Sequence, residues 1–267
     1  MANLVRAVMI TAGKSWWSKW EPKRMEMIEN IEAQNTKGTS RRIMSMLEGK
    51  PVGRVLDAPA GHGPISKLLN DAGHSVTAVD LDNENFAAEG VLMVSADLND
   101  PLPFQDGTFD YAVCADGIEH LENPFACIRE FARVLKKDGL LIISTPNISA
   151  FRSRQRYLFS GFHNKGRKPM EEESPSLKHH ISLLTFTQLR YGLHRFGLRI
   201  EEINTNRIKP AALYTAIYYP IVAAWTARVL FREKDPRQRV LNKEIYRQML
   251  SWPVCMGETI ILSSRKR

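Results

Sequence analysis

Short apolar runs recur along the middle of the chain, at the spacing of strands that alternate with helices. The runs that predict strands are 52–57, 75–80, 91–95, 109–115, 139–144, 197–204 and 257–263. These runs lack the strict alternation of polar and apolar residues that a sheet with one solvent-exposed face shows. We therefore expect strands that are covered on both faces. Stretches with helical periodicity are 25–49, 64–69, 124–135 and 187–196. The alternation predicts an open, doubly wound α/β sheet, preceded by N-terminal helices.

Two segments interrupt this rhythm. Residues 148–184 are irregular, basic and rich in His, Lys and Ser, and a long excursion within a compact domain is usually a functional lid. Residues 207–254 form a second insertion, which is hydrophobic and basic. We therefore expect an N-terminal helical, aromatic and basic segment over 1–50, and one domain built from 51–206 and 255–267.

The first strand ends in an acid and runs straight into a glycine turn, Asp57-Ala-Pro-Ala-Gly-His-Gly63, and a helix follows at once. Glycine has no Cβ to block a ligand, and the helix N-terminus directs N–H groups to the same place. Further acids follow later strands: Asp80, Asp97 and Asp116. Ligands of open α/β sheets bind beyond these strand ends. Asp80 suits ribose hydroxyls and Asp97 suits the exocyclic amine of adenine, so a nucleoside ligand is predicted.

These motifs carry a family resemblance. The runs 55–63, 76–80, 96–98 and 109–113 resemble those of class I S-adenosylmethionine-dependent methyltransferases. The stretch 118–139 resembles the large subgroup (type 11) that includes quinone-biosynthesis and small-molecule methyltransferases. The resemblance implies a Rossmann-like sheet of seven strands whose last strand is antiparallel.

The resemblance also implies the cofactor, S-adenosyl-L-methionine, and the residues that hold it. Pro59 departs from the family's usual first glycine, which casts little doubt on cofactor binding. The implied cofactor-binding residues are Asp57, Ala58, Pro59, Ala60, Gly61, Gly63, Asp80, Leu81, Asp97, Leu98, Ala115, Asp116 and Gly117.

Methyl transfer to an oxygen requires removal of a proton, and histidine has a pKa suited to that task. His120, just after the fourth strand, is the first candidate; a structural hydrogen bond is its alternative role. His179 and His180, at the end of the lid segment, are further candidates, with a solvated loop pair as the alternative. Glu119 is a weaker candidate. Cysteines and histidines show no metal-ligand spacing, so we expect no metal.

The formal net charge of +8 is unevenly distributed. Residues 1–54 contribute +5, residues 55–147 contribute −10 and residues 148–267 contribute +13. Basic ends favour an anionic partner, and a solvated basic surface is the alternative. Cys114 and the other two cysteines are scattered, and no secretory signal is evident, so a reduced cytoplasmic compartment is expected.

Residues 211–227 carry no charge, and a basic stretch with Arg228 and Arg232 follows. The run is short for a membrane span and Pro220 interrupts it. Aromatic residues with a basic flank predict peripheral membrane contact through 211–239, and through the Trp- and Lys-rich stretch 14–24. A roof over the acceptor pocket is the alternative.

Together these features predict S-adenosylmethionine-dependent O-methylation of a small, amphiphilic, lipid-linked or glycan-linked acceptor. The transfer is expected to be in line, with a His general base. An RNA methyltransferase is the second hypothesis, although no RNA-binding module is recognisable and nucleic acid is not the expected partner. A non-catalytic partner protein that binds the cofactor is the third. The acceptor and the oligomeric state stay open.

Overall fold

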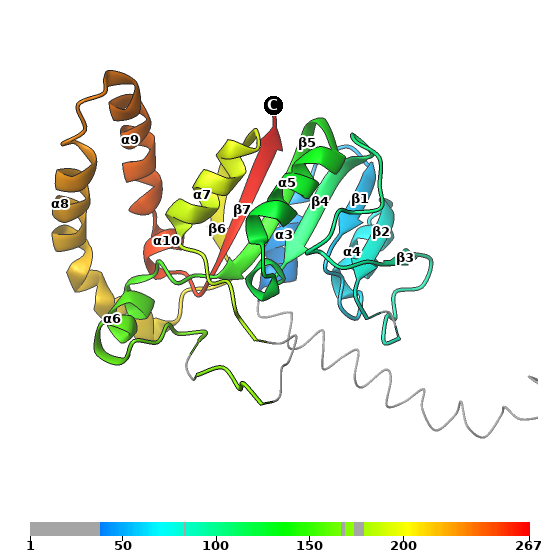
Figure 1. The fold of residues 1–267 in the computed structure, drawn as a ribbon, viewed down its shortest axis with the longest axis horizontal. Coiled ribbons are helices and arrows are strands. Elements are labelled where there is room, and N and C mark those ends of the chain that lie inside the picture. The colour runs from blue at the N-terminus through cyan, green and yellow to red at the C-terminus, as the bar shows by residue number, and fades with distance from the viewer. Residues whose placement is uncertain (1–37, 83, 167–168, 174–178) are drawn as a thin grey trace, which may run out of the picture.

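The computed structural model describes residues 38–82, 84–166, 169–173 and 179–267 (Figure 1). Seven strands form one sheet in the order β3-β2-β1-β4-β5-β7-β6. Their bounds are β1 (Arg54–Asp57), β2 (Ser75–Asp80), β3 (Leu92–Ser95), β4 (Phe109–Ala115), β5 (Leu135–Pro146), β6 (Leu198–Thr205) and β7 (Thr259–Lys266). Neighbours from β3 to β5 are parallel, and β7 is antiparallel to both β5 and β6. The predicted fold class is confirmed.

Helices cover both faces of the sheet, as expected for strands without polar alternation. On one face, α3 (Thr39–Leu47) and α4 (Pro64–Asp71) pack Ile43, Leu47 and Leu69 against the strands. On the other face, α5 (Pro124–Val134) and α7 (Phe186–Arg195) contribute Phe131 and Leu189 to the larger core. Burying a side chain such as Phe131 stabilises the fold by about 1.5–3 kcal/mol. The helices are α3 (Thr39–Leu47), α4 (Pro64–Asp71), α5 (Pro124–Val134), α6 (Phe151–Ser160), α7 (Phe186–Arg195), α8 (Tyr219–Leu230), α9 (Pro236–Met249) and α10 (Trp252–Met256), with the short 3₁₀ helices η1 (Ile118–His120) and η2 (Pro210–Tyr218).

The segment expected to be irregular, 148–184, contains α6. This helix was missed because its sequence, Phe-Arg-Ser-Arg-Gln-Arg-Tyr, shows no apolar repeat at helical spacing. Phe151 and Ser153 are its buried residues, and Phe151 anchors it against Leu250 and Met256. Packing at one end of the helix therefore replaces the amphipathic stripe that sequence reasoning relies on.

The insertion between β6 and β7 forms a hairpin of α8 and α9 that projects from the β6 end of the sheet, opposite β3 (Figure 1). The amide of Asn242 donates to the carbonyl of Leu230 at 2.7 Å, and the Phe231 and Tyr246 rings pack together. No residue of α8 is buried. Among the described residues, none of the helices has the length and the apolar character needed to cross a membrane.

Arg190 ties the hairpin to the sheet domain and, together with Arg199, flanks a histidine. Arg190 of α7 is buried and forms an ion pair with Glu244 of α9 at 3.1 Å. The ring nitrogens of His194 lie 3.0 Å from Arg190 and 2.7 Å from Arg199. Burial, together with these two guanidinium groups, lowers the pKa of His194 to about 4. The histidine is therefore neutral in the folded protein at physiological pH.

Candidate active site

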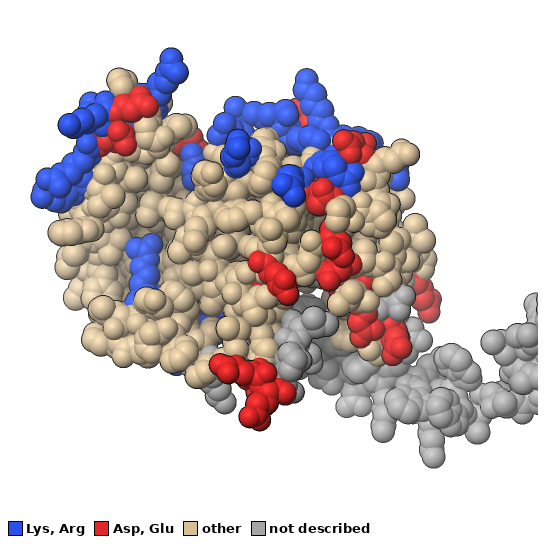
Figure 2. Space-filling model, viewed as in Figure 1, with Lys and Arg blue, Asp and Glu red and all other residues tan. Residues whose placement is uncertain are grey.

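A cavity of about 200 Å³ lies at the carboxyl ends of β1, β2 and β4, where the sequence predicted the nucleoside ligand. We call it the cofactor cavity. In the orientation of Figures 1 and 2, the carboxyl ends of these strands lie at the lower edge of the molecule. Acidic side chains are visible along this edge in Figure 2, consistent with acids that follow strand ends. The predicted cofactor residues that line it are Asp57, Pro59, Ala60, Gly61, Asp80, Ala115 and Asp116.

The glycine turn is held open by hydrogen bonding and by backbone conformation. Gly61 and Gly63 have φ angles of 54° and 89°, in the left-handed region that favours glycine. The Gly61 N–H donates to Oδ2 of Asp80 at 2.7 Å, so the acid of β2 braces the turn that follows β1. A Cβ on Gly63 would collide with the Phe86 ring. The turn therefore needs both glycines in their observed conformation.

Asp57 is a buried carboxyl with half of its hydrogen-bonding capacity unused. Its Oδ2 accepts from the Ser66 hydroxyl at 2.6 Å, whereas the buried Oδ1 has no partner among the described residues. Burial raises the pKa of Asp57 to about 7, against the effect of the Ser66 bond. A buried acceptor that lines a cavity fits a cationic ligand, because a positive charge would stabilise the ionised carboxylate.

Other predicted cofactor residues support the wall of the cavity. Ala58 is fully buried behind the turn. Gly117 packs so closely on the Pro59 ring that a Cβ at this position would overlap the ring atoms. The proline that departs from the family pattern is therefore matched by a glycine that leaves room for it.

Leu81, Asp97 and Leu98, which were also predicted to hold the cofactor, lie outside the cavity lining. Leu98 is buried in the core and Leu81 is 49% exposed. Oδ1 of Asp97 accepts from the backbone N–H of Asn99 at 2.8 Å and from its amide at 3.0 Å. The adenine contact of Asp97 and Leu98 stays a prediction.

The three candidate histidines come together, although His120 is far in sequence from the other two. Nδ1 of His120 lies 3.0 Å from the carbonyl oxygen of His179, and the His120 and His180 rings pack edge to face at 4.8 Å. A carbonyl oxygen only accepts, so Nδ1 of His120 carries the proton and Nε2 is left with its lone pair. Burial, then the charges of His120 and Lys165, lower the pKa of His180 to about 4. His179 contributes its backbone to this arrangement.

Glu119 adds a buried carboxyl to the histidine cluster. Its Oε2 accepts from the Thr145 hydroxyl at 2.9 Å. Burial and then Asp116 raise the pKa of Glu119 to about 8, so the group is protonated at neutral pH. Ligand atoms of Glu119, His120 and His180 lie within 4.8 Å of one another, a group that could hold a metal ion. Spacing along the sequence did not reveal this group, because α5, β5 and α6 separate His180 from the other two residues along the chain.

A second cavity, of about 250 Å³, lies beyond the carboxyl end of β5, where Asn147 and Ile148 line it. We call it the basic cavity. It is lined by Arg152 from α6, Lys165, Lys209 and Glu258, among others. The charge of Lys165 acts on both Glu119 and His180, so one lining residue of the cavity is within electrostatic range of the cluster. Sequence reasoning identified the basic composition of this half of the chain and none of these residues individually.

Five lining residues of the cofactor cavity were not among the predicted ones: Thr39, Ser40, His62, Pro64 and Ile65. Thr39 and Ser40, in the first turn of α3, are buried and line it.

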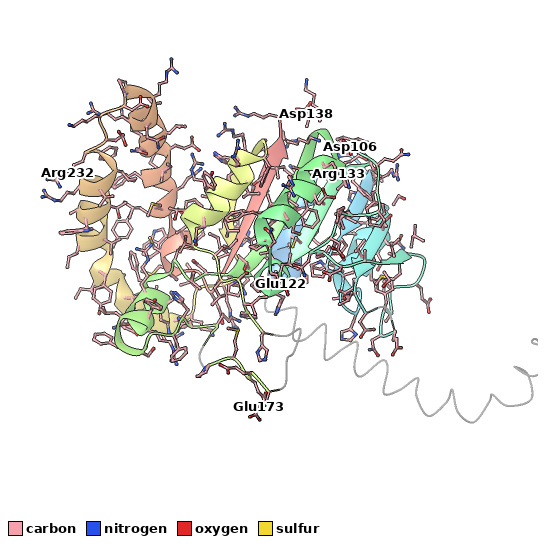
Figure 3. All side chains as sticks on the ribbon, in the orientation of Figure 1. Asp106, Glu122, Arg133, Asp138, Glu173 and Arg232 are labelled. Carbon is pink, nitrogen blue, oxygen red and sulfur yellow. The ribbon has the colours of Figure 1, made fainter. Side chains whose placement is uncertain are left out.

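In Figure 3, Glu122, just after the His120 turn, lies at the lower edge of the sheet, and Asp138 lies at the opposite edge. Both cavities lie at the edge to which the parallel strands point, because the last residues of β1, β2 and β4 line the cofactor cavity and Asn147, which follows β5, lines the basic cavity.

Comparison with known proteins agrees with this geometry. The family described as a methyltransferase domain matches residues 28–203. A ubiquinone biosynthesis O-methyltransferase of Psychrobacter cryohalolentis is 29% identical over 167 residues, which cover 54% of this chain and 62% of the relative. The chain thus spans less than two thirds of the length of this relative.

Solved structures share the fold at low sequence identity. An S-adenosylmethionine-dependent methyltransferase of Mesorhizobium loti has a TM-score of 0.52 at 17% identity, covering 86% of this chain and 99% of that one. The [4+2]-cyclase SpnF has a TM-score of 0.51 at 18% identity, covering 87% and 81%. A likeness at this level establishes the fold, and the cyclase illustrates that a shared fold does not fix the reaction.

Proposed function

The chain belongs to the methyltransferase domain family, and we propose that it transfers a methyl group from S-adenosyl-L-methionine to an oxygen of an amphiphilic acceptor. The position of both cavities at the carboxyl edge of the parallel strands supports this proposal. Asp116 lines the cofactor cavity, and the charge of Lys165 acts on its carboxylate, as does that of His120 once this ring is protonated. Lys165 in turn lines the basic cavity. An acceptor in the basic cavity would thus meet the cofactor beside His120.

The buried carboxyl of Asp57 and the strand-end acid Asp80 are proposed to hold the cofactor. When bound, S-adenosylmethionine supplies a methyl group that is activated by a sulfonium. Oδ1 of Asp57 is free to accept from a cationic group, and Asp80 retains oxygen lone pairs beyond those used by Gly61. Bringing both reactants into one geometry can lower the activation barrier by about 7–11 kcal/mol.

His120 is proposed as the general base. The carbonyl of His179 fixes the ring and its tautomer, so Nε2 is free to take the proton from an acceptor hydroxyl. The lowered pKa of His180 keeps that ring neutral, so it does not repel the imidazolium that His120 becomes. Glu119, protonated at neutral pH, adds no negative charge that would trap the proton.

The cofactor site is tested by calorimetric titration of S-adenosylhomocysteine into wild type, Asp80→Ala and Asp82→Ala. Asp82 is an exposed acid two residues from Asp80 and serves as the matched control. We expect binding to wild type and to the control, and at least about tenfold weaker binding to Asp80→Ala, because a hydrogen bond to a charged group is worth about 1.5–3 kcal/mol. No binding to folded wild type would refute the proposal.

Turnover is tested with a radiolabelled methyl donor and hydroxylated aromatic acceptors that carry alkyl tails. Methylated product that depends on His120 supports the O-methyltransferase role. Loss of turnover on chelation, with recovery on adding Zn²⁺ or Mg²⁺, would give Glu119, His120 and His180 the role of metal ligands and contradict a free His120 base. Methylation of RNA instead would favour the second hypothesis.

Membrane-surface contact is proposed for the α8–α9 hairpin and its neighbours. A broad area over this end of the molecule is almost free of charge in Figure 2, and Lys and Arg gather above it at the hairpin tip. Arg232 points outward there in Figure 3. Ile221, Trp225 and Val229 share one face of α8 at a spacing of four residues. The exposed side chains that we call the apolar surface are Leu158, Phe159, Leu213, Ile217, Ile221, Trp225 and Val229.

We propose that the apolar surface binds anionic membranes, because the basic residues beside it complement anionic headgroups. In sedimentation with phosphatidylglycerol-containing vesicles, wild type should pellet with the vesicles. The double variant Ile221→Ser/Trp225→Ser should remain in the supernatant. Val52→Ser, at a 65% exposed apolar residue before β1, is the control. Equal sedimentation of all three proteins would refute the contact. The Trp-rich stretch 14–24 lies outside the described residues.

A further inference from the structure

The basic cavity carries more positive than negative charge. Arg152, Lys165 and Lys209 line it, and Glu258 is its acid. Glu258 is already engaged, because Nε of Arg207 donates to it at 2.5 Å and Nζ of Lys209 at 2.6 Å. Burial works against ionisation here, but these two bonds lower the pKa of Glu258 to about 2. Glu258 is therefore ionised, and the charges of Arg207 and Lys209 neutralise it. The other lining cations, Arg152 and Lys165, give the cavity a net positive charge.

Arg152 is the cation that lacks a counter-ion. It is half-buried on the first turn of α6, and its guanidinium forms no hydrogen bond or ion pair with the described residues. Nζ of Lys165 lies 3.9 Å from the Glu258 carboxylate, too far for a hydrogen bond. Partly desolvated cations without a partner are costly, and an anion would remove that cost.

Other polar groups of the basic cavity are occupied within the protein. The Asn147 amide donates to three backbone carbonyls between Pro253 and Gly257. The Ser153 hydroxyl pairs with Nδ1 of His163 at 3.1 Å and accepts from the Asn164 N–H at 3.2 Å. The hydrogen-bonding capacity that remains for a ligand is therefore mainly cationic, with the five N–H donors of Arg152 at its centre.

The cavity also adjoins the apolar surface. Ala212 of η2 lines the cavity, and the next residue, Leu213, is 54% exposed and belongs to the apolar surface. The Gln155 amide of α6 bonds to Tyr214 and Tyr218 of η2, which holds the two elements together at this point. A molecule anchored in the cavity can therefore lay an apolar tail along η2 without leaving the protein surface.

We propose that the acceptor carries an anionic group, a carboxylate or a phosphate, which binds Arg152 in the basic cavity with Lys165 and Lys209 around it. This inference rests on the proposed methyl transfer and names the class of acceptor for it. The anionic group anchors the acceptor and is not the methylated atom; the hydroxyl to be methylated lies on the side of His120. Arginine suits either group, because its planar fork matches both oxyanions.

Binding of short amphiphiles tests this assignment. Octyl phosphate, octanoate and octyl glucoside share an eight-carbon tail and differ in the head group. Each is titrated as a monomer into the S-adenosylhomocysteine-loaded protein, using wild type, Arg152→Gln, Arg152→Lys and Arg195→Gln. Arg195 is an exposed arginine of α7 outside both cavities and matches the change in charge.

Wild type should bind at least one of the two anions about tenfold more tightly than octyl glucoside, the value of one charge-assisted hydrogen bond. Arg152→Gln should abolish this preference, Arg152→Lys should restore part of it, and Arg195→Gln should retain it. The tighter of the two anions identifies phosphate or carboxylate. Equal binding of all three amphiphiles, or a preference that survives Arg152→Gln, would overturn the assignment. S-adenosylhomocysteine should bind Arg152→Gln as tightly as wild type. Loss of the anion preference with cofactor binding intact concerns the anion site alone, whereas failure of wild type to bind S-adenosylhomocysteine would refute the proposed function.

Discussion

Replacing Asp57 by asparagine should stabilise the ligand-free protein and weaken cofactor binding. The folded-state pKa of Asp57 is raised from 3.8 to about 7, mainly by burial. The unfolded chain therefore gives up this proton at a lower pH than the folded protein does. Stability from the protonated form is present below the unfolded pKa and is lost as the pH rises from about 4 to 7.

The size of the effect follows from the shift. A shift from 3.8 to about 7 corresponds to about 4 kcal/mol in the free energy of unfolding above neutral pH, at about 1.4 kcal/mol for each pKa unit. Of this, about 2–3 kcal/mol is lost between roughly pH 5 and pH 8. Asparagine keeps the shape of the side chain and still accepts from the Ser66 hydroxyl, but it does not ionise.

Urea unfolding of wild type and Asp57→Asn at the two ends of this pH range measures the difference. The advantage of Asp57→Asn should grow as the pH rises, whereas the exposed control Asp82→Asn should follow wild type. S-adenosylhomocysteine should bind the Asp57→Asn variant more weakly, because a cationic ligand loses its buried carboxylate. Parallel pH profiles for wild type and Asp57→Asn would refute the account of this group.

Three further changes test other parts of the structure. His120→Asn should lower turnover by about 10²- to 10⁴-fold with little change in cofactor affinity, as expected for loss of a general base. His194→Gln is the control, because His194 lines neither cavity. Unchanged turnover of His120→Asn would exclude His120 as the base. Gly117→Ala should weaken S-adenosylhomocysteine binding in calorimetry, because the new methyl group overlaps the Pro59 ring; wild-type affinity would contradict that packing. The stability of the folded protein should fall as the pH drops from 6.5 towards about 4, because the unfolded chain protonates His194 before the folded protein does. In thermal unfolding, the melting temperature of His194→Gln should decline less steeply with falling pH than that of wild type. Identical slopes would argue against this contribution of His194.

The sheet and the glycine turn were predictable because each depends on short stretches of sequence. β2 and β4 begin and end where the apolar runs predict, since strands that are buried on both faces contain few polar positions. Gly61 and Asp80 were identified separately, and parallel strands bring their carboxyl ends to one edge, where the two residues form a hydrogen bond. Local pattern and sheet topology together were therefore sufficient for most of the cofactor cavity.

The basic cavity was not predictable, because its side chains come from four separate segments. Arg152 lies in a helix without an apolar repeat, and Glu258 precedes the last strand. Likewise, Glu119 was ranked low as a candidate because nothing in its neighbourhood of the sequence shows that it is buried and protonated. Such groupings depend on how the chain folds back over the sheet after β5, and spacing along the sequence does not contain that information.

The α8–α9 hairpin is inserted into what would otherwise be a simple β-hairpin. β6 and β7 are antiparallel neighbours, and the backbone N–H of Glu258 donates to the carbonyl of Arg207 at 3.1 Å, which closes the base of the insertion. Both ends of the insertion thus leave the sheet at the same place. Evolution can lengthen, shorten or exchange such a segment without changing any strand pairing. The hairpin is therefore separable from the cofactor-binding sheet, so the surface that it presents can diverge while the cofactor site is inherited unchanged.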